Sequence, residues 1–232
     1  MVAITTVGFD ADDTLWHNER HFKLTQARFA ELLADHAGPD HLAERLLAAE
    51  RRNLGRYGFG IKGFVLSMIE TALDVTGDRV PASVIRRIVA MGQDMLAHPI
   101  ELLPGVAETI DALAGRYRLL LITKGDLLDQ ERKVAQSGLG ERFDGVEIVS
   151  DKDPQTYARI FARHGEGAEA GLMAGNSMRS DVLPMIAAGG RGVLVPHGEA
   201  WALEHAPAPV AEPRYHEVGR ISELPDLIAR LS

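Results

Sequence analysis

The sequence predicts an α/β protein in which a doubly wound parallel sheet forms the core and a purely helical domain is inserted near the amino terminus. Two observations lead to this prediction. From residue 102 onward, short apolar runs alternate with segments of helical period, as they do in parallel sheets whose strands are joined by helices. Before residue 101, a single apolar run is followed only by helical segments. We therefore expect residues 1–16 and 101–232 to form the core and residues 17–100 to form a separate helical domain.

The individual elements follow in chain order. Residues 2–9 are apolar and are predicted to form the first, buried strand. Helices are expected at 18–37, 39–52, 64–77 and 81–96, because apolar residues such as Phe22, Phe29 and Leu33 recur at helical spacing and Pro81 suits a first turn. Helices at 102–115, 126–138, 154–165 and 180–190 then alternate with strands at 117–123, 144–150, 170–176 and 191–196. A short strand at 215–218 and a terminal helix complete the chain, and no catalytic residue is predicted in residues 200–232.

Composition excludes several functions. The chain has 232 residues, of which 46% are hydrophobic and 25% charged, and these values are ordinary for a soluble globular protein. The formal charge of -8 argues against broad binding to nucleic acids or anionic membranes. There is no cysteine, so disulfides, thiolate metal sites and a cysteine nucleophile are excluded. Because no apolar stretch reaches signal-peptide or membrane-spanning length, a cytoplasmic protein is expected.

Three aspartates, Asp10, Asp12 and Asp13, follow the first predicted strand in the stretch VGFDADDTLWHNE. Like charges this close repel one another and lose hydration when they are partly buried. Ligands of open α/β sheets bind at the carboxyl ends of the strands, and a hard divalent cation such as Mg²⁺ is the simplest way to stabilise carboxylates there. The alternative is a solvated acidic turn, or a pair of helix caps formed by Asp12 and Asp13.

The other strand ends place polar residues at the same predicted edge of the sheet. Thr123 ends the second strand just before Lys124 and a helix start, where a hydroxyl and free N–H groups suit phosphate. Lys152 follows the third strand and supplies a positive charge. Asn176 and Asp181 follow the fourth, where a carboxylate could complete an octahedral Mg²⁺ site. Each residue alone also fits a purely structural role, but together they would require four coincidences at one edge.

In order and position, these residues resemble the motifs of the haloacid dehalogenase superfamily. The matching stretches are DADDT from Asp10, LLLIT ending at Thr123, SDKDP around Lys152, and GNSMRSD from residue 175. The resemblance covers the whole core and implies a Rossmann-like fold. It also implies that residues 17–100 are a helical cap inserted between the first and second motifs.

The resemblance implies a chemical role for each matching residue. Asp10 would be the nucleophile that forms an aspartyl-phosphate, and Asp12 would be first the general acid and then the general base. Thr123 would hold a phosphoryl oxygen, and Lys152 would offset charge between Asp10 and the phosphate. Mg²⁺ would bind Asp10, Asp181 and the backbone carbonyl of Asp12, and would stabilise the transition state.

One position departs from the family pattern. Many members carry an acidic residue where Asn176 stands, and an amide there can still ligate the ion or orient water but removes one negative charge. Asp181 is therefore the stronger candidate for a direct metal ligand. Thr14 is expected to brace the first loop, and Asp13 is expected to have a structural role.

Asp12 favours the phosphatase branch. Dehalogenases of this superfamily release halide, have no alkoxide to protonate, and typically lack an acid at this position, while P-type ATPases carry membrane helices. We therefore expect Mg²⁺-dependent hydrolysis of a small phosphorylated metabolite. The alternatives are a phosphomutase or dehalogenase of the same superfamily, or a non-catalytic binding protein on the same fold.

A glycine pattern in the helical domain could be mistaken for a nucleotide-binding motif. Gly58, Gly60 and Gly63 have G-x-G-x-x-G spacing, but the dinucleotide motif requires a strand immediately before it, and here the preceding residues are helical. A turn between two helices is expected instead.

Substrate-selecting residues are predicted at three places, each with surface exposure or packing as the plainer alternative. At the glycine-rich turn the candidates are Arg56, Tyr57 and Lys62. Just after the aspartate cluster they are Trp16 and His17, and after Thr123 the candidate is Lys124.

Overall fold

The computed structural model describes residues 2–199 and 201–231. The chain divides into two compact units, a core unit of Met1–Glu19 with Ile100–Ser232 and a helical unit of Arg20–Pro99. The sequence alone placed the corresponding boundaries at 16/17 and 100/101. Within the described residues, no helix is long and apolar enough to cross a membrane.

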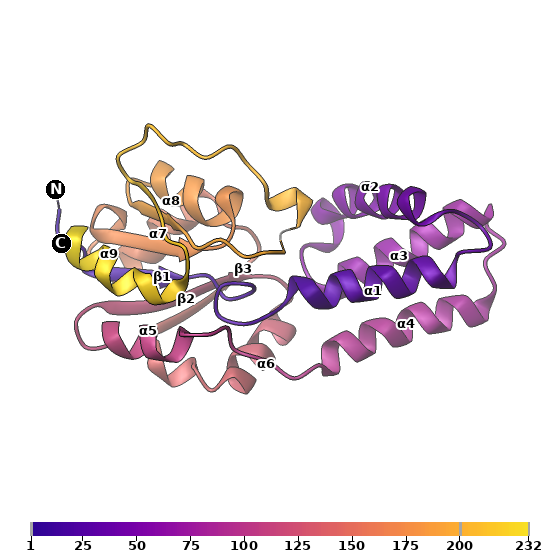
Figure 1. Cartoon of the computed structure of the whole chain (residues 1–232), viewed down its shortest axis with the longest axis horizontal. Helices are drawn as coiled ribbons and strands as arrows, with labels where there is room; N and C mark the ends of the chain where they lie inside the picture. Colours follow the sequence, from indigo (N-terminus) through magenta and orange to yellow (C-terminus); the bar gives the residue numbers. More distant parts are fainter. Residues whose placement is uncertain (1, 200, 232) are drawn as a thin grey trace. The chain divides into compact units, whose positions relative to one another are not determined.

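Four helices make up the helical unit (Figure 1). They are α1 (Glu19–Leu32, which starts in the core unit), α2 (Pro39–Tyr57), α3 (Ile61–Thr76) and α4 (Ala82–Ala97). Their apolar stripes bury a shared core that includes Phe29, Leu33, Leu46, Met68 and Ile88, each at most 2% exposed. The helical spacing read from the sequence therefore identified the buried faces correctly.

The turn between α2 and α3 explains the glycine pattern. Gly58 and Gly60 have φ angles of 71° and 112°, in the region that residues with a Cβ atom rarely adopt. A Cβ atom on Gly63 would lie 3.0 Å from the carbonyl oxygen of Gly58. All three glycines are therefore accounted for by a tight connection between two helices, as the sequence predicted.

The core unit is built on six parallel strands in the order β3-β2-β1-β4-β5-β6. The strands are β1 (Thr6–Phe9), β2 (Arg118–Lys124), β3 (Gly145–Val149), β4 (Gly171–Gly175), β5 (Arg191–Leu194) and β6 (Tyr215–Glu217). Helices lie on both sides of the sheet, so the predicted doubly wound α/β fold is confirmed.

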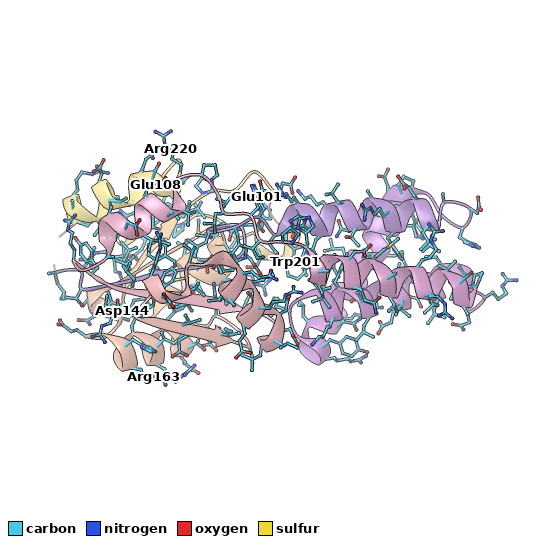
Figure 2. The ribbon with its side chains drawn as sticks, turned by 90° about the horizontal axis from the view of Figure 1, so that it is seen from below. Glu101, Glu108, Asp144, Arg163, Trp201 and Arg220 are labelled. Carbon is cyan, nitrogen blue, oxygen red and sulfur yellow. The ribbon has the colours of Figure 1, made fainter. Side chains whose placement is uncertain are left out.

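Alternate residues of the strands bury two separate cores. Val7 and Phe9 face the core formed with α5 (Val106–Leu113), α9 (Leu224–Leu231) and residues following α6 (Leu127–Ser137). Leu120 and Ile122 face the core formed with α7 (Pro154–His164) and α8 (Leu183–Ala187). Figure 1 shows α7 and α8 on one side of the strands and α5 and α6 on the other. The labelled side chains of Glu108 and Arg220 in Figure 2 mark α5 and the short helix η5 (Ile221–Glu223), which pack against each other.

Several elements have bounds that differ from the prediction by up to five residues; for example, α1 ends at Leu32 rather than at residue 37, and α2 continues to Tyr57 rather than ending at residue 52. The first strand begins at Thr6 rather than at residue 2, because pairing with both neighbouring strands starts there. The helix expected from residue 180 begins earlier, as a π-helical turn at Met178–Val182 that leads into α8. Pro184 has no N–H to donate to the carbonyl of Ser180, and that carbonyl instead accepts a hydrogen bond from the Tyr157 hydroxyl at 2.9 Å.

The turn glycines give a stability test with an internal control. Gly60→Ala should lower the free energy of unfolding by about 1–2 kcal/mol, because alanine at this φ is strained. Gly55→Ala should raise it by up to about 1 kcal/mol, since Gly55 lies exposed in α2 with no atom near its added methyl group. Urea denaturation of both variants measures this, and equal effects would show that the turn conformation is not what requires glycine at position 60.

Candidate active site

The candidate site is built from four loops that leave adjacent strands. Asp10 follows β1, Thr123 lies near the end of β2, Lys152 follows β3, and Asn176 and Asp181 follow β4. Because these four strands are neighbours in a parallel sheet, all four loops emerge at its carboxyl edge.

A buried lysine joins two of the carboxylates. The ammonium group of Lys152 donates hydrogen bonds to Oδ1 of Asp10 and, at 2.7 Å, to Oδ1 of Asp181. Asp10, Lys152 and Asp181 are all buried. Three residues far apart in the sequence thus form one charged cluster with a net charge of one negative unit.

Burial and this charge imbalance explain the titration behaviour of the cluster. Burial raises the pKa of Asp10 from 3.8 to about 7; Lys152 opposes that rise, while Asp181 reinforces it. Burial alone would lower the pKa of Lys152, but the charges of Asp10 and Asp181 outweigh burial and hold it well above its ordinary value. One ammonium group therefore does not fully compensate two buried carboxylates.

Thr14 braces the first loop against the fourth. Its hydroxyl donates to Oδ2 of Asp10 at 3.1 Å and accepts from the backbone N–H of Asn176 at 3.0 Å. Asp181 is held from the same loop, because the backbone N–H of Ser177 donates to its Oδ2 at 2.9 Å. A Cβ atom on Gly175 would lie 2.2 Å from that oxygen, so only glycine leaves room for it.

Asp12 lies in a cage of donors. Its carboxylate accepts from Trp16 Nε1 at 2.7 Å, from Gln130 Nε2 at 2.9 Å, and from Lys133 Nζ at 2.9 and 3.0 Å. Burial alone would raise the pKa of Asp12, but Lys133 and the hydrogen bonds lower it below the ordinary value. In this arrangement Asp12 is therefore an ionised carboxylate, the form that can accept a proton.

Asp13 caps the helix that follows. Its carboxylate accepts from the backbone N–H of Asn18 at 2.8 Å and of Glu19 at 2.9 Å. Its φ angle is 60°, which aspartate tolerates better than most residues. His197 Nδ1 lies 3.7 Å from Oδ1 of Asp13, and the rings of His197 and His17 pack edge to face with centroids 5.8 Å apart. His17 is thus placed beside a helix cap, next to the loop that follows β5.

Lys124 was predicted to contact substrate, and this stays a prediction. Its ammonium group pairs with Oε1 of Glu204 at 2.6 Å and donates to the Ser180 hydroxyl at 2.7 Å, and only 14% of its side chain is exposed. Lys124 therefore links β2 to the fourth loop. Thr123, its neighbour in β2, is buried at the sheet edge, where the sequence placed it.

Trp16 was predicted to line an entrance, and this also stays a prediction. In the structure Trp16 is completely buried and its indole N–H donates to Asp12. Arg56, Tyr57 and Lys62 lie exposed at the α2–α3 turn of the helical unit, so their part in substrate selection stays a prediction.

Sequence reasoning missed several side chains of the core unit that contact site residues, among them Gln130, Lys133 and Glu204. Gln130 and Lys133 lie one turn apart on α6 and are buried, but the local sequence LDQERKVAQ does not indicate this, because the residues around them are also polar or charged. Glu204 lies in the proline-containing stretch where no catalytic residue was predicted, and nothing in its local sequence distinguishes it from an exposed glutamate.

The donor set suits a hard divalent cation better than a metal such as zinc. Among the described residues, no group of three or more His, Cys, Asp or Glu side chains could hold a metal ion by themselves. Mg²⁺ needs only one or two carboxylates, with waters and substrate oxygens completing its shell. Asp10 and Asp181 provide two carboxylates that already reach one shared cation, the ammonium of Lys152. The residues present therefore fit Mg²⁺.

Comparison with known proteins identifies the family. The family model described as haloacid dehalogenase-like hydrolase matches residues 4–189. None of the curated proteins matches the chain. A crystal structure of a haloacid dehalogenase-like family hydrolase from Xanthomonas campestris is 44% identical, with a TM-score of 0.88; the match covers 99% of this chain and 92% of that one.

More distant structures share the fold alone. A haloacid dehalogenase-type hydrolase from Bacillus subtilis, bound to magnesium, is 19% identical with a TM-score of 0.64, and the match covers 97% of this chain and 99% of that one. An L-2-haloacid dehalogenase from Xanthobacter autotrophicus, with chloropropionic acid covalently bound, is 18% identical with a TM-score of 0.66. The match covers 99% of this chain and 100% of that one.

The charge imbalance at Asp10 predicts a pH-dependent stability of the metal-free protein. The pKa of Asp10 is about 7 in the folded chain and 3.8 ordinarily. The stability contributed by the protonated carboxyl group of Asp10 is therefore present below pH 4 and is lost as the pH rises through 7. Asp10→Asn removes this loss, so in EDTA at pH 8 the variant should be about 2 kcal/mol more stable than the natural chain, with a smaller gap at pH 5.

Urea denaturation at the two pH values measures that gap. Asp94→Asn, at an exposed position of α4, is the matched control and should change stability little at either pH. An Asp10→Asn variant no more stable than the natural chain at pH 8 would show that Lys152 compensates both carboxylates.

Proposed function

This chain belongs to the haloacid dehalogenase-like hydrolases, and from this we propose that it is a magnesium-dependent phosphatase that hydrolyses a small phosphorylated metabolite through an aspartyl-phosphate on Asp10. One observation carries the proposal. A buried carboxylate paired with Lys152 stands two residues before a second carboxylate, Asp12, that is equipped to exchange a proton.

The leaving group decides between a phosphatase and a dehalogenase. Halide leaves as a stable anion and needs no proton, whereas the alkoxide of a phosphate ester is a poor leaving group until it is protonated. A proton donor at position 12 is needed only for the second reaction. Asp12 therefore supports phosphate-ester hydrolysis over dehalogenation.

In the first half of the proposed reaction, an oxygen of the Asp10 carboxylate attacks phosphorus. The bond from phosphorus to the leaving oxygen breaks, and that oxygen takes a proton from Asp12. Asp12 is ionised in the structure, so it must first be protonated; a bound phosphate dianion favours this, because a nearby negative charge raises the pKa of a carboxyl group. Lys152 offsets the charge that gathers between Asp10 and the phosphoryl group.

In the second half, Asp12 acts as the base. A water molecule gives its proton to the Asp12 carboxylate and attacks phosphorus, and the bond to Asp10 breaks to release inorganic phosphate. The cage formed by Lys133, Gln130 and Trp16 favours the ionised form that this step requires. Thr123 would hold a phosphoryl oxygen through its hydroxyl.

Mg²⁺ would be held by Asp10 and Asp181, by the backbone carbonyl of Asp12, and by Asn176 either directly or through a water molecule. When bound, the ion would supply positive charge to the phosphoryl oxygens during transfer. Asn176 lowers the negative charge of this set by one unit compared with an acidic residue, so the two carboxylates carry most of the attraction for the ion.

We further propose a small metabolite as the substrate and a cytoplasmic location. The formal charge of -8 disfavours nucleic acids and anionic membranes as partners. The helical unit would act as the cap of the family, and a lid of this kind suits a small ligand. Arg56, Tyr57 and Lys62 at its α2–α3 turn are the proposed sources of selectivity.

Asp10→Asn tests the nucleophile. With p-nitrophenyl phosphate and Mg²⁺, the variant should release phosphate at least about a thousandfold more slowly than the natural chain, because an amide cannot attack phosphorus. Its far-ultraviolet circular dichroism should be unchanged. Undiminished turnover would remove Asp10 from the mechanism, and chloride release from 2-chloropropionate without any phosphatase activity would replace the proposal with dehalogenation.

Asp12→Asn tests the proton donor through the leaving group. The ratio kcat/KM reports formation of the aspartyl-phosphate, in which the leaving oxygen is protonated. For glycerol phosphate it should fall about 10²–10⁴-fold, and for p-nitrophenyl phosphate much less, because nitrophenolate leaves without a proton. Equal losses with both substrates would assign Asp12 a role other than acid catalysis.

A further inference from the structure

Glu204 lies outside all four motif loops but contacts two of them. Glu204 is the last residue of the short helix η4 (Ala202–Glu204). This helix begins directly after Trp201, which Figure 2 labels. Oε1 of Glu204 pairs with Lys124 at 2.6 Å. Oε2 accepts hydrogen bonds from the hydroxyl groups of Ser177 and Ser180, at 2.5 Å each. One carboxylate oxygen is therefore bound to the last residue of β2 and the other to residues that follow β4.

Three side chains of the fourth loop donate hydrogen bonds to η4. Arg179 donates to the backbone carbonyl of Leu203 at 3.0 Å, while Ser177 and Ser180 on either side of Arg179 donate to Glu204. The π-helical turn at Met178–Val182 is thus held by the last two residues of η4. Such turns are rare and are frequently found at functional sites.

Ser177 connects Glu204 to the candidate metal ligand. Its hydroxyl donates to Glu204 and also accepts from the backbone N–H of Ser180 at 2.9 Å. Its own backbone N–H donates to Oδ2 of Asp181, whose Oδ1 accepts from Lys152. The orientation of the Asp181 carboxylate therefore depends on a residue that Glu204 holds in place.

We propose that Glu204 is a positioning residue for divalent-ion binding: by anchoring Ser177 and Ser180, it holds Asp181 in the orientation in which it faces Asp10. The inference rests on the proposed function, because it concerns the ion that the phosphatase would use. Partners of this kind, which hold a ligand without touching the metal, typically change metal affinity by 10–100-fold when they are removed.

An ordinary stabilising ion pair is the competing explanation, and it makes a different prediction. A pair between Lys124 and Glu204 that only stabilised the fold would lower the unfolding midpoint when broken and leave metal affinity unchanged. A long-range effect of charge would weaken cation binding whenever any nearby carboxylate is lost. The anchoring role predicts that the serine hydrogen bonds matter, even where no charge is changed.

The experiment measures Mg²⁺ affinity by isothermal titration calorimetry on the full chain, with no substrate and no activity readout. Glu204→Ala should weaken binding at least about tenfold. Ser180→Ala, which changes no charge, should weaken it in the same direction, and the double variant should be no weaker than Glu204→Ala alone, since both act through one anchor. Glu212→Gln, which removes one partly exposed carboxylate of the same segment that pairs with Arg214, should leave affinity unchanged.

Each outcome decides between the possibilities. If the natural chain does not bind Mg²⁺, the proposed function fails; if it binds and Glu204→Ala binds equally well, only the positioning role fails. Equal weakening by Glu212→Gln and Glu204→Ala would replace anchoring with long-range charge. Urea denaturation in EDTA checks folding. If Glu204→Ala is unfolded, Ser177→Ala decides in its place, because an unchanged affinity in the variant that lacks the linking hydroxyl overturns the proposal.

Discussion

The core unit depends on one buried ammonium group shared by two carboxylates. Lys152 reaches Asp10 and Asp181 together, and without it two negative charges would be buried side by side at the edge of the sheet. The compensation is incomplete, because one positive charge faces two negative ones. The remaining charge explains the raised pKa of Asp10 and makes the same place attractive to a divalent cation.

Two further polar clusters surround this centre, and each fixes one loop. Asp12 is held by Lys133 and Gln130 from α6, and the loop that carries Asp181 is held by Glu204 from η4. Side chains from elsewhere in the core unit add to the short-range backbone hydrogen bonds of these loops, such as those from Asp13 to Trp16 and from Asp181 to Ser177. Precise loops at an enzyme site require this kind of support, because small displacements of a reacting group cost much of its effect.

The ionised state of Asp12 refines the chemical interpretation. A carboxylate surrounded by donors favours accepting a proton. In the proposed mechanism this form suits water activation rather than protonation of a leaving group, so the two proposed half-reactions place opposite demands on this one residue. An environment that changes when the phosphate dianion arrives can meet both demands, because the phosphate carries the charge that stabilises the protonated form.

The sequence by itself determined the fold class, the buried faces of the helices, and the alignment of four polar loops at one edge of the sheet. These features follow from periodicity and strand order, which record burial along the chain. Only the tertiary structure decided which side chains meet: that Trp16 is buried against Asp12, that Lys124 pairs with Glu204, and that β1 starts where both of its neighbours begin to pair. Hydrogen-bond partners are set by where separate elements come together, and a local pattern carries no record of that meeting.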